Sequence, residues 1–382
     1  MTAEDPHPPL PDAPSPSLSP SPSPESAPLL DALTDVAGIR VGHAQVSGAG
    51  ALSGTTVVLA PEGGAVAAVD VRGGGPGTRE TDALDPRNLV QRVDAVVLTG
   101  GSAYGLDAAS GVMAWLEERG RGVRVGADPT QVVPVVPAAA LFDLGRGGDW
   151  RARPDSSTGR AAVEAAAVSE PGAPVAEGNV GAGTGAVAGQ LKGGVGTASV
   201  RLASGVTVAA LVAVNAAGSV LDPRTGVLFG EYGAGEPPAH PAPTTHAAAV
   251  RRLAREREAA EAAGGGAPPF NTTIAVVATD ADLVRAQAQK LAGTAHDGMA
   301  RAVRPVHLLT DGDTVFALAT GRVRVEPENP VAVNEILAAG ADVLARAIVK
   351  AARAARSVQG PGGTFLAHAD LYGEGPDGRF EA

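Results

Sequence analysis

The stretch Pro268-Pro-Phe-Asn-Thr-Thr-Ile-Ala-Val-Val-Ala-Thr-Asp280 marks the place where an irregular part of the chain gives way to a regular one. The residues before it are mostly Ala, Gly and Pro, which are typical of loops. From Thr272 to Thr279 the residues are mostly apolar or β-branched, which is the composition of a buried strand. The stretch therefore predicts a buried β-strand that opens with a hydroxyl residue directly after a loop.

The hydroxyl of Thr272 permits a reaction at the peptide bond that joins this residue to Asn271. It can attack the Asn271 carbonyl, an N-to-O acyl shift gives an ester, and water releases a new N-terminus. The freed α-amine, whose reference pKa is about 7.7 to 8.0, can then act as base for its own hydroxyl. The alternative is a turn residue followed by a strand former, with no chemical role. In a secreted chain, residues 271–273 would also match a glycosylation acceptor.

Length and composition favour a closely packed α/β protein. At 382 residues the chain can bury a large core, in two domains or in one large α/β domain. Hydrophobic residues make up 44% of it, aromatic residues only 3%, and glycine occurs 51 times. The core must therefore be built from Ala, Val and Leu, which suits tight layers of sheet and helix.

Charge and residue usage argue against several functional classes. The net charge of −11 and the lack of a basic stripe argue against a nucleic-acid partner. The chain has no cysteine, and its seven histidines show no metal-ligand spacing. No apolar run is long enough to span a bilayer, and the N-terminus lacks a signal-peptide pattern. We expect a cytoplasmic protein that binds no membrane, metal or organic cofactor.

Composition also divides the chain into parts. Residues 1–28 contain Pro/Ser repeats that cannot bury enough apolar surface to offset their ordering entropy, so we expect a disordered tail. Residues 29–271 and 272–382 then form one folded domain, in two pieces if the chain cuts itself. Residues 233–271 read as a linker that contains a charged helical stretch at 246–263.

Periodicity and capping residues indicate further elements. We expect strands at 94–98 and 206–214, helices capped by Asp155 and Asp280, and a long helix over 331–358. The glycine turn Thr99-Gly-Gly-Ser-Ala-Tyr-Gly105 leads from a strand into a helix, but it spells neither G-x-G-x-x-G nor the P-loop pattern. We expect it to allow close approach of backbone to substrate or to another strand, with a nucleotide site as the alternative.

Two polar residues lie in apolar or glycine-rich surroundings. Lys192, within Gln190-Leu-Lys-Gly-Gly-Val-Gly196, is either a solvated loop residue or a lysine close to a reacting group with a lowered pKa. Asn215 ends a mostly apolar strand, where asparagine is either a turn former or an amide donor for an oxyanion.

Two carboxylates stand two residues apart at the mouth of a later strand. Because alternate side chains of an extended backbone share one face, Asp311 and Asp313 can point the same way. Like charges that close together favour a cation between them, and an N-terminal ammonium would be such a cation. The alternative is an Asp-Gly turn with solvated acids.

With these residues in view, the chain resembles the P1 family of self-processing hydrolases. That family contains L-aminopeptidase/D-amidases, β-peptidyl aminopeptidases and nylon-oligomer hydrolases. The similarity runs from about Leu33 to Leu371 and includes the turn at 99–106. It implies an αββα sandwich of the N-terminal-nucleophile type, related to ornithine acetyltransferase. It also implies cleavage into an α chain and a β chain at Asn271–Thr272, and assembly into a homo-oligomer, a tetramer of αβ heterodimers.

The same resemblance implies a role for each candidate residue. Thr272 matches the nucleophile, Lys192 a lysine beside it, Asn215 the oxyanion-stabilising amide, and Asp311 and Asp313 the pair that holds the nucleophile's amine and hydroxyl. Threonine with Asp-Gly-Asp is closer to the nylon-oligomer hydrolases than to the aminopeptidases, many of which use serine. A family tyrosine near the site falls at Phe142, which has no hydroxyl.

These roles predict an amide hydrolase that acts through a Thr272 acyl-enzyme. Its substrates would be small peptides or linear amide oligomers such as 6-aminohexanoate oligomers. Three alternatives stay open: a strict aminopeptidase or D-amidase, an acyltransferase of the ornithine acetyltransferase type, and a non-catalytic assembly in which the chain stays intact.

Overall fold

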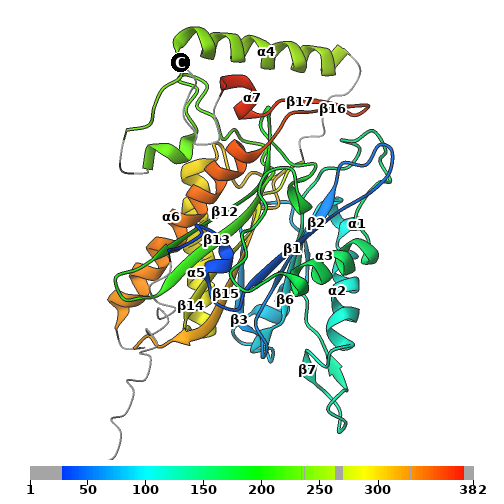
Figure 1. Cartoon of the computed structure of the whole chain (residues 1–382), viewed down its shortest axis with the longest axis vertical. Coiled ribbons are helices and arrows are strands. Elements are labelled where there is room, and N and C mark those ends of the chain that lie inside the picture. The colour runs from blue at the N-terminus through cyan, green and yellow to red at the C-terminus, as the bar shows by residue number, and fades with distance from the viewer. Residues whose placement is uncertain (1–27, 234, 236, 263–269, 327–328, 374–382) are drawn as a thin grey trace, which may run out of the picture.

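The computed structural model describes residues 28–233, 235, 237–262, 270–326 and 329–373. Its main layers are a pair of helices, a five-stranded sheet, a six-stranded sheet and a second pair of helices (Figure 1). This is the order of layers that the resemblance implied. The predicted tail at residues 1–28 lies outside the described residues, apart from Pro28.

The strand predicted after Asn271 lies inside the six-stranded sheet. In spatial order this sheet contains β12 (Gly194–Arg201), β13 (Thr207–Val214), β14 (Ile274–Ala281), β15 (Thr314–Val323), β3 (Ala65–Val71) and β5 (Arg92–Val93). All residues of β14 are buried, as its apolar composition predicts. β14 pairs antiparallel with β13 and parallel with β15.

The second sheet faces the first. In spatial order it contains β1 (Arg40–Gln45), β2 (Gly54–Leu59), β6 (Ala95–Thr99), β9 (Ala138–Ala140) and β4 (Gly77–Arg79). β6 pairs antiparallel with β2 and parallel with β9. β6 confirms the strand expected at 94–98.

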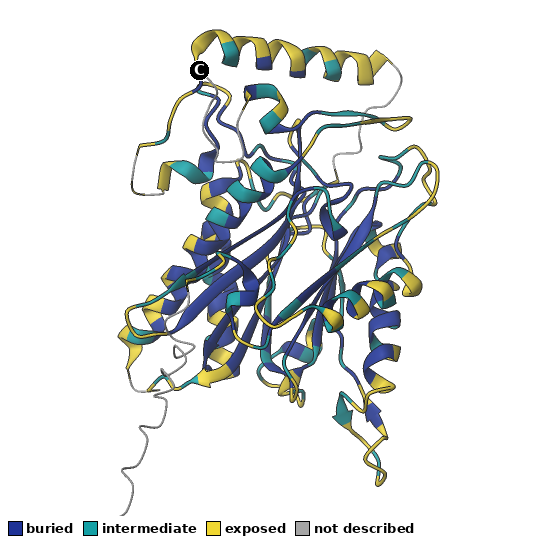
Figure 2. Cartoon of the chain, in the orientation of Figure 1, coloured by how far each residue is buried: buried dark blue, intermediate teal, exposed yellow. Residues whose placement is uncertain are grey.

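Alternation along the strands of the six-stranded sheet separates two apolar cores, one on each face of the sheet. Leu211, Val276 and Phe316 point between the sheets, where they join residues of the five-stranded sheet such as Val58. Their neighbours along the strands, such as Val277, point the other way toward the outer helices. Figure 2 shows the result, two buried sheets with exposed residues on the outer helices.

Each sheet carries one pair of helices on its outer face. α5 (Arg285–Ala302) and α6 (Pro330–Ala354) cover the six-stranded sheet, and α2 (Ala108–Glu117) and α3 (Ser156–Val168) cover the five-stranded sheet. Asp155 caps α3 by accepting a hydrogen bond from the Thr158 N–H, as expected. α6 begins at Pro330 because Asn329 caps it and proline suits a first helical position.

The remaining elements are short, except for one helix. They are η2 (Leu33–Asp35), η3 (Asp82–Leu84), α1 (Ser102–Gly105), β7 (Val123–Arg124), β8 (Val132–Val133), η4 (Gly181–Gly183), β10 (Val187–Ala188), β11 (Leu191–Lys192), η5 (Phe229–Gly233), α4 (Pro243–Ala262), β16 (Val358–Gly360), β17 (Gly363–Phe365) and α7 (His368–Tyr372). α4 lies across one end of the molecule beside α7 (Figure 1) and buries Ala249 and Leu253. It forms the helical part of the predicted linker.

One predicted helix start is wrong. Asp280 lies inside β14, where its carboxylate accepts a hydrogen bond of 2.8 Å from the Thr207 N–H. The helix begins five positions later, at Arg285. The prediction is wrong because the sequence around an aspartate that bonds to a neighbouring strand can look the same as the sequence around a helix cap. Across the described ranges, every helix is too short or too polar to span a bilayer.

Candidate active site

Sheet topology brings three of the predicted positions to one edge. Asn215 directly follows β13, Thr272 stands two residues before β14, and Asp313 stands one residue before β15. Because β13 is antiparallel to β14, its end lies beside the start of β14. Because β15 is parallel to β14, their starts lie side by side. The three residues therefore lie at the same end of neighbouring strands although they are far apart in the sequence.

Thr272 is buried and its hydroxyl is directed at the preceding peptide. Its side chain and backbone together are 4% exposed. Its N–H donates to the Asn215 carbonyl oxygen at 2.6 Å. Its Oγ1 donates to the Asn271 carbonyl oxygen and accepts from the Gly312 N–H at 3.1 Å. The hydroxyl thus lies directly against the carbonyl group that self-cleavage requires it to attack.

The two carboxylates flank Gly312, and backbone N–H groups satisfy both of them. Asp313 accepts from the Thr273 N–H at 2.8 Å, and from the backbone N–H and ring Nδ1 of His307 at 3.0 and 2.8 Å. Asp311 accepts from N–H groups at positions 308 and 217, at 3.1 and 3.2 Å. Burial and the neighbouring Asp313 charge raise the pKa of Asp311. In the continuous chain these N–H groups surround the carboxylates where a cation was expected.

Lys192 lies in β11 and is 1% exposed. Its ammonium donates to three backbone carbonyls, of Gly183, Ala186 and Gly193, at 2.9, 2.9 and 2.8 Å. Burial lowers its pKa to about 7, the Arg146 charge acts in the same direction, and Asp143 opposes them. Through its contacts with Gly183 and Ala186, the lysine stabilises the loop that leads to β10.

The side chain of Asn215 is held on both of its ends. Its Oδ1 accepts from the Val187 N–H at 3.0 Å and from Arg146 Nη1, and its Nδ2 donates to the Phe142 carbonyl at 3.2 Å. Because Val187 directly follows Ala186, the loop that Lys192 ties down also positions this amide. Lys192 is thus linked to the site through the backbone of Ala186 and Val187 and the side chain of Asn215.

Arg146 and His307 belong to the site although the sequence interpretation did not select them. Arg146 Nη2 donates to Asn271 Oδ1 at 2.9 Å, while Nη1 contacts Asn215 Oδ1 and donates to the Gly185 carbonyl at 2.8 Å. One usable signal for Arg146 is its place between glycines, which permit close approach of backbone. No comparable signal marks His307.

A cavity of about 280 Å³ opens beside Thr272. It is lined by Gly75, Pro76, Gly77, Ser102, Ala103, Ala140, Phe142, Phe270, Asn271, Thr272 and Thr310. The rings of Phe142 and Phe270 lie with centroids 5.9 Å apart. Among these described lining residues there is no Asp or Glu. The cavity is large enough for a short acyl group, and its walls are mostly apolar.

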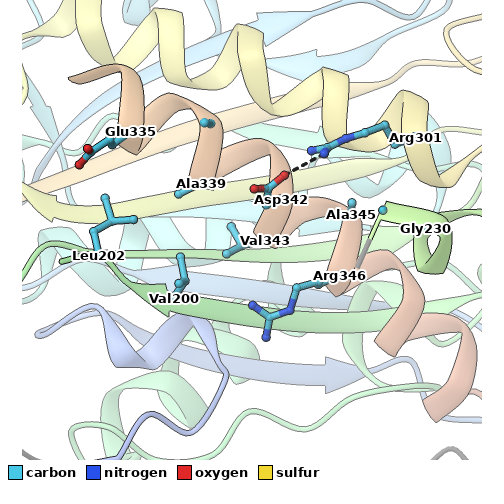
Figure 3. Close-up of a pocket in the computed structure, with 12 residues that line it drawn as sticks. Val200, Leu202, Gly230, Arg301, Glu335, Ala339, Asp342, Val343, Ala345 and Arg346 are labelled. Carbon is cyan, nitrogen blue, oxygen red and sulfur yellow. Dashed lines mark hydrogen bonds and ion pairs between the residues drawn. The ribbon is translucent and has the colours of Figure 1, made fainter. Parts of the chain in front are cut away.

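A larger hollow on the outside of α6 differs from this cavity in its chemistry. Figure 3 shows its lining, where Arg301 and Asp342 form an ion pair of 2.8 Å above Val200 and Leu202. The hollow has a volume of about 470 Å³, and its described lining residues include no Ser, Thr, Cys or Lys, so they offer no hydroxyl, thiol or amine nucleophile. The cavity beside Thr272 is therefore the candidate active site.

The four layers define an α/β protein, and a solved protein of the Ntn hydrolase fold shares this fold. An L-aminopeptidase D-Ala-esterase/amidase from Ochrobactrum anthropi, reported as a new variant of the Ntn hydrolase fold, superposes with a TM-score of 0.65. It is 22% identical, and the match covers 90% of this chain and 93% of that chain. At this identity the likeness shows the fold.

The chain belongs to peptidase family S58, which matches residues 31–366. A relative named as an uncharacterized aminopeptidase from Mycobacterium tuberculosis is 50% identical over 351 residues, covering 87% of this chain and 96% of that protein. A 6-aminohexanoate-oligomer endohydrolase from Kocuria sp. is 31% identical over 296 residues, covering 76% and 75%. These matches confirm the resemblance and make the chain a hydrolase of peptide or amide bonds.

Proposed function

We propose that the chain cuts itself between Asn271 and Thr272, and that the freed Thr272 then hydrolyses amide bonds in small peptides or linear amide oligomers. The observation that carries this proposal is the placement of the Thr272 hydroxyl. It is buried, it contacts the Asn271 carbonyl, and it receives the Gly312 N–H. A hydroxyl held against the preceding carbonyl has the proximity that an intramolecular acyl shift needs.

Self-cleavage and substrate hydrolysis share one set of bond changes. In self-cleavage Oγ1 bonds to the Asn271 carbonyl carbon, the C–N bond breaks, and the hydroxyl proton passes to the leaving nitrogen. Water then splits the ester, which releases the Asn271 carboxylate and restores the hydroxyl. With a substrate, the freed amine of Thr272 takes the hydroxyl proton and returns it to the leaving amine.

The neighbouring groups suit these steps. The Asn215 carbonyl accepts from the Thr272 nitrogen and would hold the freed amine in place. One hydrogen of Asn215 Nδ2 is used by the Phe142 carbonyl, and we assign the other to the oxyanion. Asp313 fixes the Thr273 N–H, and Asp311 anchors the loop before Gly312. Lys192 would act as a positioning residue through the backbone before Val187.

Intact-mass measurement and N-terminal sequencing of the purified protein test the proposal. The wild type is expected to give a fragment that begins at Thr272, as is a Thr272→Ser variant. A Thr272→Ala variant is expected to stay whole, because it lacks the attacking oxygen. A wild type that remains whole under native conditions overturns the proposal, and so does cleavage of the alanine variant at the same bond.

The lining of the cavity favours substrates that do not place an ammonium group there. An aminopeptidase that holds its substrate's ammonium needs a carboxylate at the acyl side, and the described lining residues supply none. Hydrolysis of a linear amide oligomer should therefore survive acetylation of its N-terminus. Loss of activity on the blocked oligomer would instead indicate a strict aminopeptidase with the same nucleophile.

A further inference from the structure

The contact between Arg146 and the Asn271 side chain indicates which acyl groups the site takes. In the continuous chain Asn271 occupies the acyl side of the bond that Thr272 faces. Its Oδ1 accepts from Arg146 Nη2 at 2.9 Å. The ester formed in self-cleavage is chemically an acyl-enzyme with Asn271 as its acyl residue. Residue 271 therefore marks the position that the acyl residue of a substrate would take.

Self-cleavage would leave this arginine without one of its acceptors. Its other contacts, to Asn215 Oδ1 and the Gly185 carbonyl, do not involve Asn271 and would remain. Once Asn271 leaves the site, Nη2 faces the vacated space. A largely buried guanidinium N–H that lacks an acceptor is costly, and a ligand that supplies one recovers that cost.

The charges around Arg146 affect its protonation and the kind of group that can bind beside it. Burial lowers its pKa to about 10, and the nearby Asp143 opposes that shift, so the group is a cation at neutral pH. The Arg146 charge contributes to lowering the pKa of the neighbouring Lys192, and burial raises the pKa of Asp143. The local field therefore favours an acceptor oxygen, neutral or anionic, and disfavours a second ammonium.

We propose that Arg146 selects substrates whose acyl residue carries an acceptor oxygen on a short side chain, an asparagine-like amide or an aspartate-like carboxylate. The inference rests on the proposed function, because it takes residue 271 as the template of the acyl residue. Leucine has the same branching and the same number of side-chain heavy atoms as asparagine but offers no acceptor. The pair therefore isolates the hydrogen bond from cavity filling.

Two measurements on a wild-type Arg146 background test the proposal. The first compares kcat/KM for asparagine and leucine p-nitroanilides, each with free and acetylated amine. We expect roughly tenfold or greater preference for asparagine, from one hydrogen bond to a charged donor. The second follows self-cleavage of Asn271→Leu, which should slow by a comparable factor. Equal hydrolysis of the two anilides, or undiminished self-cleavage of that variant, overturns the proposal.

Variants of Arg146 separate selection from mere support of the fold. Arg146→Met should lower kcat/KM for the asparagine anilide toward the value for the leucine anilide, and should change kcat/KM for the leucine anilide less. In the same background, Asn271→Leu should no longer slow self-cleavage. An equal loss on both anilides would leave Arg146 a purely supporting role and contradict the proposal. Arg153→Met is the matched control, since Arg153 lies in the same part of the chain and stacks 3.8 Å over the Tyr104 ring. A wild type that fails to cut itself contradicts the proposed function instead, so the two failures differ.

Discussion

Replacing Gly312 with alanine places a methyl group where the candidate nucleophile lies. A Cβ built at this position is 2.7 Å from Thr272 Oγ1, 2.8 Å from the Gly75 carbonyl oxygen and 3.0 Å from Pro76 Cα. Two of these three neighbours are backbone atoms, so rotation of the Thr272 side chain alone cannot make room. The chain must shift, and the Gly312 N–H, which donates to Oγ1, shifts with it.

The size of the effect follows from this geometry. Relief of these contacts requires a displacement of several tenths of an ångström at the attacking oxygen, and a misplacement of about 1 Å costs on the order of 100-fold in rate. We expect self-cleavage of Gly312→Ala to slow by roughly 10- to 100-fold. Overpacking should lower the free energy of unfolding by about 1–3 kcal/mol, which leaves the protein folded.

Time-resolved intact-mass measurement after purification reports the rate of cutting, and urea denaturation reports stability. Gly360→Ala is the control, because a Cβ at Gly360 meets no atom within 4 Å and its substitution should change neither quantity much. If Gly312→Ala cuts itself at the wild-type rate, the Thr272 hydroxyl and Gly312 do not share the proposed geometry. An unfolded variant would show in the urea experiment and would refute the estimate of 1–3 kcal/mol.

Two further predictions concern pH and the outer layer of the fold. Because the pKa of Lys192 falls from 10.5 to about 7 on folding, the unfolded chain binds more protons in that window, and the free energy of unfolding rises with pH there. Urea titrations should show the wild type gaining on the order of 2 kcal/mol over Lys192→Met from pH 7 to 9, and a pH-independent difference would refute this. Asp155→Ala removes the cap of α3 and should cost about 1 kcal/mol of stability without slowing self-cleavage. Slower cutting in that variant would show coupling from the outer helices to Thr272.

Much of the layered fold could be predicted because its strands and helices carry strong local signals. β13 (Thr207–Val214) and β14 are mostly apolar, and α6 has a periodic apolar stripe, so the sequence predicts each of them within a few residues. The helix expected to be capped by Asp280 was misplaced because the partner of that carboxylate, Thr207, is 73 positions away. A local rule cannot weigh such a contact.

The sequence by itself determined the junction at Asn271 and Thr272 and the chemical types of Lys192, Asn215, Asp311 and Asp313. Composition changes abruptly at the junction, and the four polar residues stand out in apolar or glycine-rich surroundings. Only the tertiary structure decided which groups touch. Arg146 bonds to Asn271, which is 125 positions away in the sequence. His307, whose backbone is in the left-handed region, bonds to Asp313. The reason is that strand order and register set these distances, and both depend on packing between segments remote in sequence.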